Sequence, residues 1–109
     1  NNEMEEFNMA VVDISTKLGK EKQTIKIAEG KVYEVDTSAD NYLLVQEKLK
    51  NKEFSIEVMY EMIEMLLGKE ALQTIKDMKL TIPGLRTVII ALSAIVNEVD
   101  FEEMEKRFQ

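Results

Sequence analysis

The chain contains no cysteine, no histidine and no tryptophan, and only one of its 109 residues is proline. The absence of cysteine excludes disulfides, thiolate zinc sites, iron–sulfur clusters and thiol nucleophiles. The absence of histidine removes the side chain that most often transfers protons near neutral pH and ligates transition metals. An enzyme built from this sequence would depend on carboxylates, lysines and hydroxyl groups. We therefore expect no catalytic site, no metal site and no cofactor.

Basic residues are also in the minority, with 14 Lys and Arg against 21 Asp and Glu, which gives a net charge of −7. The mean field of such a chain repels phosphate backbones, and its basic residues are interspersed with glutamate, so nucleic acid is not an expected partner. No apolar run approaches the roughly 20 residues of a membrane span, and nothing indicates a secretory signal. We expect a cytoplasmic protein with no membrane partner.

The pattern of apolar residues changes at residue 36, from alternation to helical spacing. This change predicts an α+β fold in which a small antiparallel β element, residues 9–35, packs on a helical block, residues 36–109. The length suits a single domain over residues 9–109. Residues 1–8 are polar and acidic, so we expect an extension outside the domain, with Met4 or Met9 as the native start.

The first part of the β element has two interpretations. Residues 9–16 are rich in β-branched side chains, which favours a strand, the third of the sheet. The alternative is an amphipathic helix, because apolar residues also recur at spacings of three and four. These residues are Met4, Phe7, Val11, Ile14 and Leu18.

The next two apolar runs predict a hairpin whose register follows from parity. A two-residue loop at Glu29–Gly30 would set Ile25 opposite Glu34, with the apolar faces pointing in opposite directions. A three-residue loop, Ala28–Gly30, sets Ile25 opposite Tyr33 and gives glycine the left-handed position. The predicted apolar face consists of Ile25, Ile27, Tyr33 and Val35.

Capping signals and helical spacing predict a bundle of four to five helices in the second block. The predicted helices run from a cap within residues 36–38 to about Lys50, from the Ser55 cap to Leu67, over residues 69–79, from Pro83 to Val99, and briefly after Asp100. In the first of these helices Tyr42, Val45 and Leu49 form an apolar stripe, which Leu43 and Leu44 are expected to widen.

The helix after Ser55 carries a second apolar line, Val58, Met62 and Met65, besides its main apolar face. One interpretation is a central helix that is buried on several sides. The other is an adaptable docking surface, because flexible methionine side chains repack around varied partners. On the second interpretation, Ile90 and Ala94 on the flank of the long fourth helix join the three residues as candidate protein-binding residues.

Four short motifs occur in a recognisable order. They are Leu18–Lys22 (LGKEK), Gly30–Asp36 (GKVYEVD), Leu66–Ala71 (LLGKEA) and Ala94–Glu98 (AIVNE). Over about residues 9–109 this order resembles the tail assembly chaperones of tailed phages and prophages of Gram-positive bacteria.

The resemblance implies a non-catalytic protein of the bacterial host cytoplasm. It implies binding to the long tape measure protein, which is kept soluble during tail assembly, together with self-association and absence from the mature virion. An alternative is a small cytoplasmic adaptor or regulator, phage-encoded or not, that acts by binding a different protein.

Overall fold

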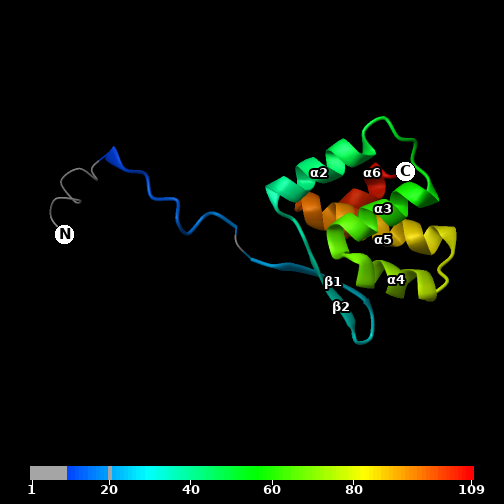
Figure 1. Cartoon of the computed structure of the whole chain (residues 1–109). Helices are drawn as coiled ribbons and strands as arrows, with labels where there is room; N and C mark the ends of the chain where they lie inside the picture. The colour runs from blue at the N-terminus through cyan, green and yellow to red at the C-terminus, as the bar shows by residue number, and fades with distance from the viewer. Residues whose placement is uncertain (1–9, 20) are drawn as a thin grey trace.

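The structure is a computed structural model that describes residues 10–19 and 21–109. This part of the chain forms a two-stranded antiparallel sheet followed by five helices, so the α+β prediction is confirmed (Figure 1). The strands are β1 (Gln23–Ala28) and β2 (Lys31–Val35). The helices are α2 (Ala39–Leu49), α3 (Ile56–Leu67), α4 (Lys69–Asp77), α5 (Ile82–Asn97) and α6 (Phe101–Arg107).

The hairpin has the predicted register, because Ile25 pairs with Tyr33. The predicted three-residue loop is wrong in detail. Ala28 still pairs with the first residue of β2, and the register shifts by one residue at Ile27. This bulge corrects the parity, so that a turn of only two residues, Glu29–Gly30, still brings the apolar side chains to one face. The glycine of the turn has a φ of 73°, the left-handed value expected there.

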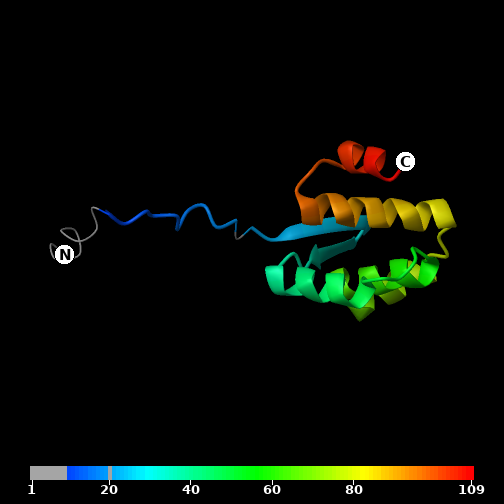
Figure 2. The ribbon, with the colours of Figure 1, turned by 90° about the horizontal axis from the view of Figure 1, so that it is seen from above.

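In its described part, the segment before the hairpin has neither of the two conformations that the sequence suggested, so both interpretations are wrong there. Residues 11–19 form neither a strand nor a helix. They make a single turn, in which the Lys17 N–H donates to the Ile14 carbonyl oxygen (2.8 Å), and they lead away from the helices (Figures 1 and 2). Met4 and Phe7 of the alternative helix lie outside the described residues. We call residues 10–19 the N-terminal arm.

The core lies where the hairpin meets α3 and α5. The inner face of β1 packs against α5 and that of β2 against α3. Helix α5 is flanked on one side by α6 and on the other by the layer of α2, α3 and α4 (Figure 2). The most deeply buried large side chains are Ile63, Ile75, Ile89 and Leu92. The predicted apolar face of the hairpin contributes to this core, as expected.

Residues at the junction of β2 and α2 satisfy the C-terminal end of α3. The last carbonyl groups of a helix have no partner within the helix. Here the Asp36 N–H donates to the Leu66 carbonyl oxygen (2.9 Å), and the Asn41 amide donates to that of Met65 (3.0 Å). The same amide also donates to the Asp36 carbonyl oxygen (3.0 Å). Asn41 is the only buried residue of α2, so this junction attaches the helix to the domain.

The predicted caps are in place, and the helix boundaries shift by a few residues. Ser38, Ser55 and Asp100 each accept a backbone N–H in the first turn of the following helix. Helix α5 begins at Ile82, one residue before the predicted start at Pro83, and it ends at Asn97 instead of Val99. It ends earlier because Glu98 adopts a left-handed φ of 54°, which lets the chain turn back into α6.

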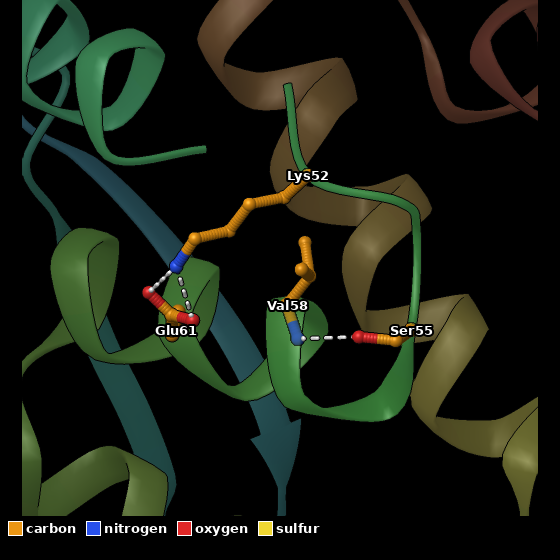
Figure 3. A network of polar contacts seen from close by, with 4 residues as sticks. All are labelled: Lys52, Ser55, Val58 and Glu61. Atoms are coloured by element: carbon orange, nitrogen blue, oxygen red, sulfur yellow. Dashed lines mark hydrogen bonds and ion pairs between the residues drawn. The ribbon is translucent and has the colours of Figure 1, made fainter. Parts of the chain in front are cut away.

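Removing the cap of α3 is expected to destabilise the domain. The Ser55 hydroxyl accepts the Val58 N–H (3.2 Å; Figure 3). Ser55→Ala should lower the free energy of unfolding by about 1 kcal/mol, as measured by urea denaturation. Ser93→Ala is a suitable control, because Ser93 lies within α5 and alanine is the better helix former there. A loss of stability in the control variant as large as that in Ser55→Ala would contradict the capping role.

Candidate protein-binding surface

The structure does not bring the five predicted binding residues together on one open surface. Val58, Ile90 and Ala94 are buried, with 7%, 6% and 5% of their surface exposed. Met62 and Met65 are half-buried. The first three residues are therefore part of the interior, and only the two methionines remain available to a partner.

Other segments of the chain cover these three residues. The Val58 side chain points into the bend of the loop between Lys52 and Ser55 (Figure 3). Ile90 and Ala94 pack with Met104 of α6 in a second apolar cluster. Helix α6 reaches them because it turns back on α5, the two helices being bent by 113°.

Glu61, one of the acidic residues of α3, has a structural role. Both oxygens of the Glu61 carboxylate accept hydrogen bonds from the Lys52 ammonium group, at 3.0 and 3.2 Å, which fastens the loop before α3 to the helix (Figure 3). Across residues 10–19 and 21–109, no three acidic side chains come close enough together to hold a metal ion. The buried side-chain polar atoms in the same residues all have hydrogen-bond partners.

The outer side of α2 exposes a group of large apolar residues. Leu43 and Leu44 are each 60% exposed, and the neighbouring Tyr42 is 43% exposed. The expectation that the two leucines widen the buried stripe is wrong. Tyr42 lies about 200° from Leu44 around the helix, on the side of Val45 and Leu49. We call Leu43 and Leu44 the α2 patch.

Helix geometry accounts for this exposure. Successive residues are about 100° apart around a helix, so Leu43 and Leu44 point well away from Val45 and Leu49, which face the domain. Because α2 packs along one flank of α3, no other helix in the described part of the chain covers its outer side (Figure 1). The angular positions of the two leucines around the helix can be calculated from the sequence, and they predict this exposure.

Met62 and Met65 line depressions on the two sides of α2. Met65 lies in a groove of about 560 Å³ between α2 and α3, with a charged rim of Lys48, Lys52, Glu61 and Glu64. Met62 lies in a smaller cavity of about 100 Å³, which Tyr42 of α2 also lines. The α2 patch lies on α2 and the two methionines lie on α3, which packs against it, and together they form the candidate protein-binding surface.

We compared the chain with protein-family models, curated proteins and solved structures. Nothing matches. Within residues 10–19 and 21–109 no helix is by itself long and apolar enough to span a membrane. Helices α5 and α6 reach the required length and composition only as a sharply bent pair.

Proposed function

We propose that this protein is a tail assembly chaperone, a non-catalytic protein that binds the tape measure protein and keeps it soluble in the host cytoplasm during tail assembly. It is not retained in the mature virion. The order of short motifs described above supports this proposal. The observation that carries it is the α2 patch, because Leu43 and Leu44 are exposed on a helix that buries only Asn41.

A chaperone of this kind must offer apolar surface to segments of varied sequence. Burying apolar surface stabilises a complex by roughly 25 cal/mol per Å², and two leucines that are 60% exposed leave much of their surface available. The half-buried Met62 and Met65 can adjust their rotamers to fit different side chains. A long helical partner presents apolar residues at spacings of three and four, which suit a groove between two helices.

The rim of the α2–α3 groove adds polar contacts. Lys48, Lys52, Glu61 and Glu64 line it, so both signs of charge are present, although Lys52 and Glu61 already pair with each other. Mixed charges contribute orientation more than affinity, so most of the binding energy comes from the apolar side chains of the α2 patch and the two methionines. The proposed mechanism is therefore reversible coverage of apolar helix segments until the tail has assembled around them.

Coexpression tests this proposal. The protein should keep a coexpressed tape measure protein in the soluble fraction. The double variant Leu43→Glu and Leu44→Glu should lose most of this effect, because two carboxylates would oppose apolar partner residues. Val32→Glu is the control, since Val32 is 54% exposed on the outer face of the hairpin, away from α2. Soluble yield of the tape measure protein, at equal levels of folded chaperone, is the measurement.

Two outcomes would count against the proposal. Unchanged rescue by the double variant would show that the α2 patch is not the binding surface. Absence of rescue by the unaltered protein, together with capture of a different protein in a pull-down from induced cells, would favour the adaptor or regulator.

A further inference from the structure

The N-terminal arm exposes apolar residues that the domain does not cover. Val11, Val12 and Ile14 are 60%, 81% and 53% exposed. In an extended conformation successive side chains point to opposite sides, so Val12 and Ile14 would share one face, and Val11 and Asp13 the other. The arm therefore has the composition and the alternation of a strand without a neighbouring strand to pair with.

The hairpin, for its part, lacks neighbouring strands. A two-stranded sheet has an unpaired edge on each side, and an isolated hairpin is marginally stable in water. Among residues 10–19 and 21–109, the backbone groups of residues 23–35 form hydrogen bonds only within the hairpin. Both outer edges are therefore free to accept a further strand.

A groove lies beside one of these edges. It has a volume of about 420 Å³ and is bounded by Gln23 at the start of β1, by the stripe Ala91, Ala94 and Ile95 of α5, and by Glu98, Val99 and Phe101. The lining is mainly apolar, and the alanines leave room for close approach. The groove meets β1 at Gln23, so a strand added along β1 would place the apolar side chains that pass this end of β1 over the groove.

Two lysines near β1 offer polar partners to the arm. Lys22 pairs with Glu34 of β2 (3.3 Å) and Lys26 pairs with Glu29 of the turn (2.7 Å). Because both ion pairs are exposed, each contributes little, so an ammonium group can take a further carboxylate as partner. In the arm the Ser15 N–H donates to the Asp13 carboxylate (2.9 Å) and lowers the pKa of Asp13. Adding the arm as a strand exchanges this hydrogen bond for contact with the lysines.

We propose that residues 10–16 of one copy of this protein add as a strand along the outer edge of β1 in a second copy. Val12 and Ile14 lie over the groove beside α5, and Asp13 faces Lys22 and Lys26. The strand comes from a second copy because each arm leads away from its own hairpin (Figures 1 and 2). Reciprocal exchange closes a dimer, and non-reciprocal exchange builds longer chains.

This inference uses a surface other than the α2 patch and does not depend on the proposed function. Loss of tape measure rescue with self-association intact would count against the function alone. Loss of self-association with rescue intact would leave the function standing.

The first test compares two valine variants by sedimentation equilibrium of the full chain. The unaltered protein should show a molar mass that rises with concentration to that of a dimer or larger. Val12→Glu should weaken association by at least about tenfold, because it carries a carboxylate into the apolar groove. Val11→Glu makes the same chemical change on the opposite face of the strand and should leave association nearly unchanged. A monomer at every concentration, or equal effects of the two variants, would overturn the proposal.

The second test uses the absence of cysteine, which makes single introduced thiols unambiguous. Val12→Cys mixed with Ala91→Cys should give a disulfide between different chains under mild oxidation. Val11→Cys mixed with Ala91→Cys should give far less. A chain that carries both Val12→Cys and Ala91→Cys and cross-links as a monomer would show that the arm folds onto its own hairpin, and the exchange would then be wrong.

Discussion

Replacing Leu92 with alanine is expected to lower the free energy of unfolding by about 2–5 kcal/mol. Leu92 has no exposed surface and lies in α5, which contacts α3, α6 and β1. The shortened side chain leaves a cavity whose walls cannot close without shifting several elements. Domains of this size have unfolding free energies of roughly 5–15 kcal/mol, so this loss is a large fraction of the total.

The same substitution at an exposed leucine provides the control. Leu43 is 60% exposed on α2, and alanine is as good a helix former as leucine. Leu43→Ala should change the unfolding free energy by less than about 0.5 kcal/mol. Urea denaturation of both variants measures the difference. The same m value, the slope of the unfolding free energy against urea concentration, is used for both. Similar losses in the two variants would show that α5 is not the centre of the core.

Replacing Asn41 with alanine should cost roughly 2–4 kcal/mol, because its buried amide donates two hydrogen bonds that no other group replaces. One of them satisfies the Met65 carbonyl oxygen at the end of α3. Besides the loss of stability, we expect faster hydrogen exchange in α2 and in the last turn of α3. Asn41→Asp should behave similarly, since a carboxylate cannot donate to either carbonyl group.

Asn97 is the matched control for Asn41. Its amide also donates to a carbonyl oxygen, that of Ser93 at 2.8 Å, but the bond is exposed and lies within one helix. Asn97→Ala should therefore change stability by no more than about 0.5 kcal/mol. Comparable effects of Asn41→Ala and Asn97→Ala would mean that the junction contributes little.

The parts of the fold that were predictable obey local rules. Pairing of Ile25 with Tyr33 follows from the alternation of two short strands, because only one parity brings their apolar sides together. Ser55 and Asp100 begin helices because their side chains accept backbone N–H groups that would otherwise lack partners. Each of these features depends on residues close together in sequence, so a single chain reveals them.

The parts that were not predictable depend on contacts between distant segments. Ile90 and Ala94 are apolar on the flank of a helix, and whether they meet a partner or the chain itself depends on where α6 turns. In the sequence Asn41 is an ordinary polar residue in the first turn of a helix. Its role depends on the position of α3, whose Met65 carbonyl oxygen it contacts. The N-terminal arm has strand composition, but a strand also needs a neighbour, and local propensity cannot supply one.

The hydrogen bonds at the end of α3 have a consequence for how the chain can be divided. Met65 and Leu66 receive their partners from Asn41 and Asp36, residues that precede them by a whole helix and a loop. Excising the hairpin together with Asp36 would therefore leave the Leu66 carbonyl oxygen at the end of α3 without its partner, even though every residue of that helix is retained. The β element and the helical block look separable in sequence, but they should unfold in a single transition.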